Sequence, residues 1–264
     1  MRHPEHDAVS QELHRWYNAA VLEIGLDGTA HWFGFTCLTG PGRARLVLSI
    51  GDPAQVPGAL PAARDACPAG SYLVMVDDRE RAARLGPALR QHGCEYQEFT
   101  TFLALAGPLA SPAPGPGNLE ITAIGPGELE TWARVKLQSF GGTEDPPSPE
   151  SLEAEIAARR AEQPLSEYQL ARLGGQPVAV LAHYPGADDL VFILGTRTPY
   201  RHRGIAQALL TRWAAASPAA TRSLLINASD GGAPAALYRR LGFTDEVYWY
   251  SRYEPAANPR DAAR

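Results

Sequence analysis

The stretch that decides the fold runs from Leu190 to Leu210 and reads LVFILGTRTPYRHRGIAQALL. Its first part, Leu190–Thr196, is a continuous apolar run, which is typical of a strand buried in the centre of a sheet. A helix is predicted to begin near Gly204, because apolar residues then recur at the three- and four-residue spacing of a face packed on a sheet. The stretch therefore predicts a buried strand, a turn and an amphipathic helix.

The predicted helix start has the chemistry of an anion site. A helix N-terminus presents about four unpaired N–H groups and a partial positive charge. Gly204 lets the backbone approach a phosphate, and Ala206 keeps the first turn free of bulky side chains. Arg201 and Arg203 are predicted to add direct phosphate contacts, whereas His202 is expected to act through its backbone.

The rest of the second half alternates between strands and helices. Apolar and alternating runs predict the strands, and apolar residues on successive turns predict the helices. In chain order the strands are expected at Leu119–Ile124, Tyr168–Leu173, Pro177–Tyr184, Leu190–Thr196, Ser223–Ala228 and Glu246–Tyr253, and the helices at Glu128–Phe140, from Ser148 to about Glu162, from Gly204, and at Ala235–Leu241. This order predicts an α+β or α/β sandwich with helices on a mixed sheet.

A Pro- and Gly-rich run without charge separates the two halves. It reads AGPLASPAPGPG from Ala106 to Gly117, and it predicts an extended spacer. We therefore expect an N-terminal α/β domain at residues 1–106, a linker at 107–118 and a second domain at 119–264.

The first half has a weaker pattern. Strands are expected at Arg45–Ile50 and Tyr72–Val76, and a helix at Glu80–Gln91. That helix, Gly93 and the aromatic-rich run after it resemble the helix, Gly242 and the strand near the end of the chain. Either the chain is a tandem repeat of one fold with a shortened first copy, or it shows the helix–glycine–strand order common in α/β proteins.

Composition excludes several classes of protein. The chain has 264 residues, of which 45% are hydrophobic and 20% charged, and its net charge is −5. Without a cluster of Lys and Arg, nucleic acid is not expected as a partner. The sequence shows neither a secretory signal nor the roughly 18 consecutive apolar residues of a membrane span, so we expect a soluble, cytoplasmic protein. Neither the histidines nor the three cysteines, Cys37, Cys67 and Cys94, have the spacing of metal ligands, and no metal is expected.

Two motifs together resemble the GCN5-related N-acetyltransferase (GNAT) superfamily. R-x-x-G-x-A after an apolar strand, here from Arg201 to Ala206, is similar to the loop with which that family binds the pyrophosphate of acetyl-CoA. Thr196 stands where Val is usual, and the family's proline is shifted by one residue, to Pro199. Downstream, LYRRLGF at residues 237–243 resembles the family's L-Y-x-x-L-G-F signature at the expected distance.

The resemblance covers about Leu119–Tyr253 and implies the acyl-CoA N-acyltransferase fold, a mixed, mostly antiparallel sheet flanked by helices. It implies acetyl-CoA as co-substrate and direct transfer of the acetyl group, in a ternary complex, to a primary amine of a small molecule or peptide. Tyr238 is then the general acid that protonates the leaving thiolate, and the alternative is a tyrosine that only packs. The implied cofactor-binding residues are Leu194, Gly195, Thr196, Arg201, His202, Arg203, Gly204, Ile205, Ala206 and Asn227.

Some positions depart from the family or stay open. Many relatives carry an Asn seven residues before the Tyr, where this chain has Gly231, and Asn227 is expected to do part of its work. Gly195 is expected to help the strand approach the cofactor closely. The candidate general bases are His183, Asp188 and Asp189, and Glu144 and Asp145 are candidates for attracting a cationic acceptor or for the base. A solvated turn residue or a water relay is the alternative for each, and Pro185–Asp189 is expected to be a turn.

A second hypothesis is a regulatory or scaffold module that binds acetyl-CoA without turnover. The first half lacks the R-x-x-G-x-A loop, so a degenerate copy there is expected to have lost the cofactor site and to contribute an acceptor-pocket wall or an interface. The sequence is compatible with a homodimer, and it fixes neither the acceptor nor the oligomeric state.

Overall fold

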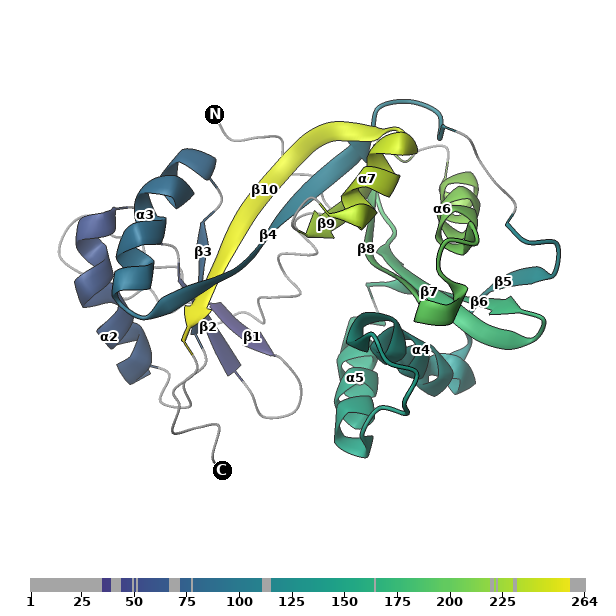
Figure 1. Cartoon of the computed structure of the whole chain (residues 1–264), viewed down its shortest axis with the longest axis horizontal. Coiled ribbons are helices and arrows are strands. Elements are labelled where there is room, and N and C mark those ends of the chain that lie inside the picture. Colours follow the sequence, from purple (N-terminus) through teal and green to yellow (C-terminus); the bar gives the residue numbers. More distant parts are fainter. Residues whose placement is uncertain are drawn as a thin grey trace. The chain divides into compact units, whose positions relative to one another are not determined.

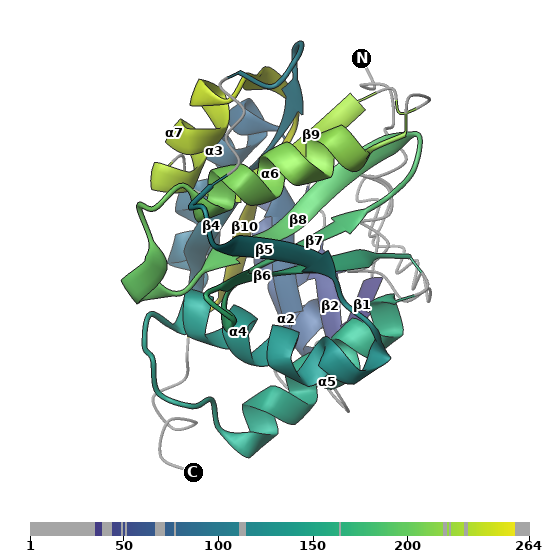
Figure 2. The same cartoon turned by 90° about the vertical axis from the view of Figure 1, so that its right-hand side faces the viewer.

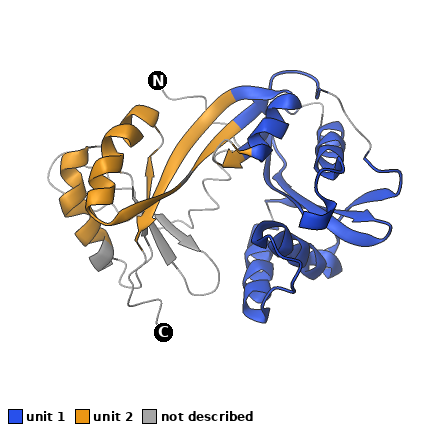
Figure 3. Cartoon of the chain, viewed as in Figure 1, with its two compact units in different colours: residues 1–12, 103–227, 233–245 blue, residues 13–102, 228–232, 246–264 orange. Residues whose placement is uncertain are grey.

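The structure, a computed structural model, describes residues 35–38, 44–48, 50, 52–66, 72–76, 78–110, 115–163, 165–218, 221, 223–229 and 232–256. The chain forms two compact units (Figure 3). Unit 1 comprises Leu103–Asn227 and Ala233–Asp245. Unit 2 comprises the described residues up to Phe102, those within 228–232 and those from Glu246 onward.

Unit 1 contains a five-stranded arrangement in the order β9-β8-β7-β6-β5. Its strands are β5 (Leu119–Ala123), β6 (Glu167–Leu173), β7 (Gln176–Tyr184), β8 (Asp188–Thr196) and β9 (Ser223–Ser229). Its helices are α4 (Leu129–Gly141), α5 (Pro149–Glu162), α6 (Ile205–Ala216) and α7 (Ala233–Arg240). β5, β6, β7 and β8 pair antiparallel, and β8 pairs parallel with β9, so the sheet is mixed and mostly antiparallel as expected.

Helices cover both faces of this sheet. α6 lies on one face, and α4 and α5 lie on the other (Figures 1 and 2). Trp213 of α6 and Trp132 of α4 are fully buried, one on each face. The Trp132 indole Nε1 donates to the Gln169 carbonyl at 3.0 Å, so the ring is oriented as well as buried.

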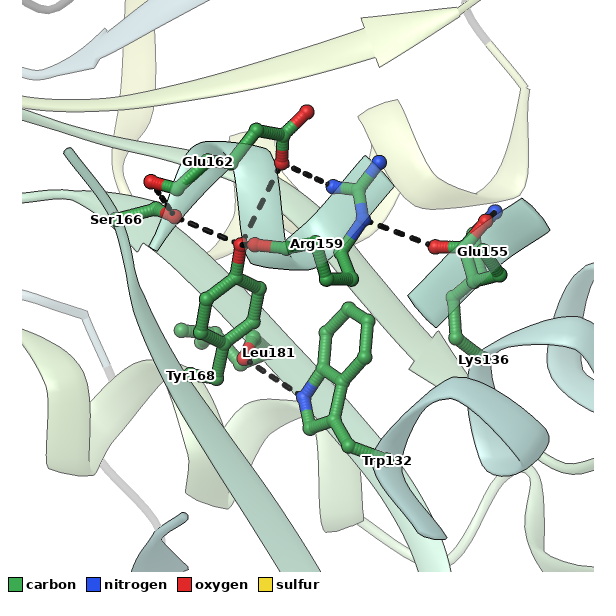
Figure 4. Close-up of polar contacts among 8 residues, drawn as sticks. All are labelled: Trp132, Lys136, Glu155, Arg159, Glu162, Ser166, Tyr168 and Leu181. Carbon is green, nitrogen blue, oxygen red and sulfur yellow. Dashed lines mark hydrogen bonds and ion pairs between the residues drawn. The ribbon is translucent and has the colours of Figure 1, made fainter. Parts of the chain in front are cut away.

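Ion pairs connect α4 and α5 beneath the sheet (Figure 4). The Lys136 Nζ lies 2.8 Å from the Glu155 carboxylate, whose other oxygen lies 3.0 Å from the Arg159 Nε. Arg159 also pairs with Glu162 at 2.5 Å. The Glu155, Arg159 and Glu162 side chains are each only 8–12% exposed, so solvent screens these charges less than it would at the surface. α4 and α5 therefore form a connected platform rather than two independent helices.

Unit 2 has a strand order of β1-β2-β3-β10-β4. Its strands are β1 (Phe35–Leu38), β2 (Ala44–Leu48), β3 (Tyr72–Val76), β4 (Cys94–Leu105) and β10 (Phe243–Pro255), of which the last two extend into unit 1. Its helices are α2 (Val56–Ala66) and α3 (Arg79–Gln91). Both helices pack on one face of β3, because Val74 and Val76 share a core with Leu60 of α2 and Leu85 of α3.

The two units repeat one order of elements. In unit 2 a strand is followed by the 3-10 helix η1 (Pro53–Gln55), then α2, a parallel strand, α3, a glycine and a long strand. In unit 1, β8 is followed by the 3-10 helix η3 (Thr198–Tyr200), then α6, the parallel β9, α7, a glycine and β10. Gly93 and Gly242 both end their helices with positive φ, 80° and 102°. This repetition of topology supports the tandem interpretation of the sequence similarity.

The predicted elements of the second half all form, with boundaries shifted by a few residues. The predicted turn at Pro185–Asp189 is wrong at its end, because Asp188 and Asp189 already belong to β8 and are 1% exposed. β1 and α2 were not predicted. The described ends of the linker contact unit 1, since the Ala110 N–H donates to the Leu241 carbonyl at 2.9 Å and the Gly174 N–H to the Asn118 carbonyl at 3.2 Å. The predicted domain boundaries stay a prediction.

Candidate functional site

β8 and β9 are paired over only part of their lengths. Their register runs from Asp188↔Ser223 to Val191↔Ile226, and within the described residues both strands continue beyond it. The opposite edge of β8 stays paired with β7 as far as Thr196↔Ala179. Leu194, Gly195 and Thr196 therefore lie in the part of β8 that has left β9, and Asn227 follows the last paired residue of β9. β8 and β9 are therefore splayed in unit 1.

The turn between β8 and α6 has an unusual backbone. His202 has φ 60° and is the only non-glycine residue with positive φ in the described parts of the chain, and Gly204 has φ 77°. Left-handed residues alternating with ordinary ones turn successive N–H groups toward one side, which makes an anion-binding concavity. Residues 201–204 are exposed, and no side chain caps the start of α6. The helix start is therefore uncapped, polar and accessible, as an anion site requires.

The arginines of this turn divide into two kinds. The Arg201 guanidinium donates to the Thr196 carbonyl at 3.1 Å and to the Ser139 carbonyl at 2.7 Å, so it connects the end of β8 to the end of α4. Arg203 instead lies over the Tyr200 ring at 5.5 Å and forms no ion pair with a described residue. The Arg203 guanidinium is therefore the more available of the two for an anion. A phosphate contact of Arg201, as predicted, would compete with the two hydrogen bonds that its guanidinium already makes.

Gly195 is in close contact with α4. A Cβ atom on Gly195 would lie 2.9 Å from the Ser139 Cβ and 3.0 Å from the Phe140 Cε2. These distances are shorter than carbon contacts normally allow. The glycine is therefore required by the packing of α4 on β8, which differs from the reason expected from the sequence.

Tyr238 lies on α7 and is 5% exposed. Its ring contacts Phe243 edge to face, with centroids 6.5 Å apart, and Phe243 stacks on Trp213. The hydroxyl forms no hydrogen bond with a described residue. Burial raises the pKa of Tyr238 above its usual value of 10.0, because desolvation disfavours the phenolate. The phenol therefore keeps its proton throughout the neutral range.

Two of the three buried base candidates, His183 and Asp189, form one network. The His183 Nδ1 lies 2.6 Å from the Asp189 Oδ1, and the Asp189 carboxylate also accepts from the Trp213 Nε1 at 2.8 Å and the Ser217 Oγ at 3.1 Å. His183 is 5% exposed, so the expected solvated position is wrong for it as well as for Asp188 and Asp189. Asp189 thus anchors α6 and β7 to β8. On its other side the His183 Nε2 lies 3.5 Å from the exposed Glu167 carboxylate.

The acidic candidates in the loop after α4 are also engaged. The Glu144 carboxylate pairs with Arg197, which directly follows β8, and the Glu144 carbonyl accepts from the Gln138 Nε2 at 2.9 Å. Asp145 accepts from the Thr143 hydroxyl at 2.9 Å. Glu144 therefore joins the α4–α5 loop to the end of β8 from which the chain continues to α6, rather than presenting an unpaired charge.

Three residues of this region were missed from the sequence: Ser139, Phe140 and Arg197. Phe140 is the clearest, because it is 60% exposed and its ring contacts the position of Gly195. The available signal was an aromatic residue at a helix end, just before Gly141 and Gly142. The sequence alone did not indicate that this helix end meets β8.

In unit 2 the 3-10 helix η1, which runs directly into α2, the counterpart of α6, is capped by an acid. The Asp52 carboxylate accepts from the Ala54 N–H at 2.7 Å, and the Gln55 side-chain oxygen accepts from the Asp52 N–H at 3.2 Å. A carboxylate at this position satisfies the helix start and repels a second anion. Unit 2 therefore lacks, at this turn, the features that make the α6 start an anion site.

Two further observations concern metal ligands and membrane spans. In the parts of the chain that the structure describes, no three His, Cys, Asp or Glu side chains cluster as metal ligands would. None of the described helices is both long enough and apolar enough to cross a bilayer. Gly231, Cys67 and the histidines before residue 32 lie outside the described residues, as does the Cys37 side chain.

Unit 1 has the fold of the GCN5-related N-acetyltransferases. Its parallel strands β8 and β9 are splayed, and α6, which connects them, begins after Gly204. No protein-family model matches the chain, and no curated protein is similar to it in sequence. Among solved structures, the chain is similar to a GCN5-related N-acetyltransferase from Kribbella flavida (TM-score 0.58, 21% identity, 97% of this chain and 96% of that one). It is also similar to one from Sphaerobacter thermophilus (TM-score 0.56, 20% identity, 81% and 75%).

A third similar structure is a tandem GNAT protein from the clavulanic acid biosynthesis pathway, with a TM-score of 0.54, 14% identity, and coverage of 82% of this chain and 75% of that one. At these identities the comparisons establish the fold. They confirm the fold class expected from the two sequence motifs.

Proposed function

We propose that the protein is an N-acetyltransferase that transfers the acetyl group of acetyl-CoA to a primary amine of a small molecule or peptide. The observation that carries this proposal is the start of α6, where His202 and Gly204 adopt positive φ at an exposed, uncapped helix N-terminus. This concavity follows directly on the part of β8 that has left β9. A diphosphate bound there would place the arm of the cofactor along the free edge of β8.

Acetyl-CoA would supply an activated thioester. In this proposal the amides from 202 to 206 hold the diphosphate, and Arg203 adds charge. The backbone of Leu194, Gly195 and Thr196 binds the pantetheine arm, together with Asn227. The fit rests on the edge of β8 that β9 leaves free and on the start of α6, which no side chain of the described residues caps.

Tyr238 is the proposed general acid. Its raised pKa keeps the phenol protonated at neutral pH, and a thiolate is basic enough to take a proton from a positioned donor. Direct attack by the amine requires the amine to be neutral. An amine with a pKa near ~8 needs little help with this, whereas a lysine-like amine near ~10.4 needs a base or a water relay.

The acceptor is proposed to bind beside Phe140, at the end of α4. This side chain is exposed and lies next to Gly195, so an acceptor over its ring would be close to the cofactor arm. The Lys136 Nζ already lies 5.8 Å from the centre of this ring, so the position accommodates an amine beside the aromatic face.

Calorimetric titration with CoA, and thiol release from acetyl-CoA against an amine panel, test the proposal. Arg203→Gln is expected to weaken CoA binding about fivefold to tenfold, because it removes a charge at the loop. Arg212→Gln, an exposed arginine farther along the same helix, is the matched control and should leave the affinity unchanged. Tyr238→Phe should bind CoA normally and lose turnover.

The outcomes separate three readings. Tight binding with no turnover on any amine would favour an acetyl-CoA-binding module in which Tyr238 only packs α7. Absence of any interaction with CoA would remove the acetyltransferase proposal altogether. Turnover that survives in Tyr238→Phe would leave the transferase in place and move the general acid elsewhere.

A further inference from the structure

Unit 2 contains a cavity of about 370 Å³ between α3, β4 and β10. Four aromatic side chains line it, from Tyr96 and Phe99 of β4 and from Trp249 and Tyr253 of β10. Among the residues whose side chains the structure describes, the charged ones of the lining are Arg79 and Arg90 of α3, and none is acidic. The volume is within the range of small-molecule sites. The cavity lies away from the α2 start, so it is not the unit 2 counterpart of the proposed cofactor site.

Two hydrogen-bond donors come together at the glycine of α3. A Cβ atom on Gly86 would lie 3.1 Å from the Tyr253 hydroxyl and 3.3 Å from the Arg90 Nη1, so both groups lie near one point. Tyr253 is 4% exposed, and its hydroxyl bonds to no described residue. The Arg90 guanidinium likewise forms no ion pair in the described parts of the chain. The Tyr253 hydroxyl and the guanidinium of the exposed Arg90 therefore lie side by side with no acceptor among the described residues.

The second arginine differs from the first. Arg79 pairs with Glu246 at 2.5 Å, and its guanidinium lies 4.7 Å from the centre of the Trp249 ring. The charge of Arg79 is therefore balanced, and that of Arg90 is not. The Trp249 Nε1 is also buried without a hydrogen-bond partner. The cavity thus has one unbalanced positive charge, surrounded by aromatic faces and N–H or O–H donors.

We infer that this cavity binds a flat aromatic monocarboxylate. The single unbalanced charge matches one carboxylate, which can accept from Arg90 and Tyr253 together. The rings of Tyr96, Phe99 and Trp249 offer faces and edges on which an aromatic body packs. A phosphate monoester would bring nearly two negative charges to a site with one charge to offer. The cavity is a second ligand site, independent of acetyl transfer in unit 1.

The test titrates the full chain with 1-naphthoate and with 1-naphthamide, which has the same rings without the charge. Both titrations are run with and without excess CoA, so that binding in unit 1 is recognised by competition. The amide is expected to bind about tenfold more weakly than the acid. Arg90→Gln should weaken naphthoate binding about tenfold, and Tyr253→Phe about fivefold. Arg84→Gln, exposed on the same helix but outside the lining, is the control and should change nothing.

Each outcome decides the inference. The inference is supported if naphthoate binds the wild type and Arg84→Gln, binds Arg90→Gln much more weakly, and binds equally well with and without CoA. Equal affinity for acid and amide, or equal effects of the two arginine variants, overturns it. Phenyl phosphate and benzoate are titrated as a second pair, and tighter binding of the phosphate overturns the carboxylate assignment. If none of the four probes binds detectably, the site itself is overturned. Because CoA binding is measured in the same samples, failure in unit 2 is distinct from failure of the proposed function.

Discussion

Replacing Gly195 with alanine tests whether the end of α4 is packed on β8 as tightly as the structure indicates. The new Cβ atom would lie 2.9 Å from the Ser139 Cβ and 3.0 Å from the Phe140 ring, against about 3.5–4.0 Å for a relaxed carbon contact. Overpacking of this kind costs about 1–3 kcal/mol. Ser139 can move only with its helix, so we expect about 2 kcal/mol and a melting temperature lower by about 4–8 °C.

A double-mutant cycle identifies the contact. Ser139→Gly removes the closest atom, although glycine in a helix costs about 1 kcal/mol by itself. If the contact is real, Gly195→Ala with Ser139→Gly will be more stable than the sum of the two single effects, by about 1 kcal/mol. Gly141→Ala is the matched control on the same helix, because its nearest neighbour would be an ordinary 3.9 Å from the new atom. Thermal and urea unfolding give the stability of the wild type, the two single variants, the double variant and the control. Strictly additive effects of Gly195→Ala and Ser139→Gly would refute the packing argument.

Three further predictions concern the site. Calorimetry should give one CoA per chain, because in unit 2 the Asp52 carboxylate caps η1, which runs directly into α2, the counterpart of α6; a stoichiometry of two would contradict this reasoning. Burial raises the folded-state pKa of Tyr238 above the unfolded value near ~10, so the stability it contributes is present below that pH and lost above it. Tyr238→Phe should then lose less stability than the wild type between about pH 9 and 11 in urea unfolding, and parallel curves would refute a buried phenol. Asp189→Ala leaves the Trp213 Nε1 and the Ser217 hydroxyl without their acceptor, and it should destabilise the protein by about 3 kcal/mol with CoA affinity unchanged; an unaltered urea midpoint would count against the network.

The second half of the fold could be predicted because local signals there agree. The apolar run of β8, the glycine at the start of α6 and the spacing of apolar residues along α6 all indicate the same elements. α2 was missed although Val56, Ala59, Leu60 and Ala63 follow helical spacing, because Pro and Gly interrupt the same residues. Its beginning was marked by the Asp52 and Gln55 capping pair, a signal that could have found it.

The candidate site was predictable at its backbone and less so at its side chains. Positive φ at Gly204 follows from local sequence, since glycine adopts it without strain. Arg201, Glu144 and Asp189 each have one side-chain partner that is far away in the chain, at 62, 53 and 24 residues. Such contacts depend on tertiary packing, which periodicity does not report. The same limit explains why the solvated position expected for Asp189 is wrong.

The return of the last strand to unit 2 affects how the chain can be assembled. β3 pairs antiparallel with β10 through Val76↔Ser251, so the ribosome makes β3 first and supplies its partner only after every residue of unit 1. Until then β3 has an open edge. A nascent chain stalled within unit 1 would expose that edge, and a fragment beginning at residue 119 would carry β10 without β3. Unit 2 therefore cannot complete its sheet from the first half of the chain alone, because its strand β10 is encoded at the end.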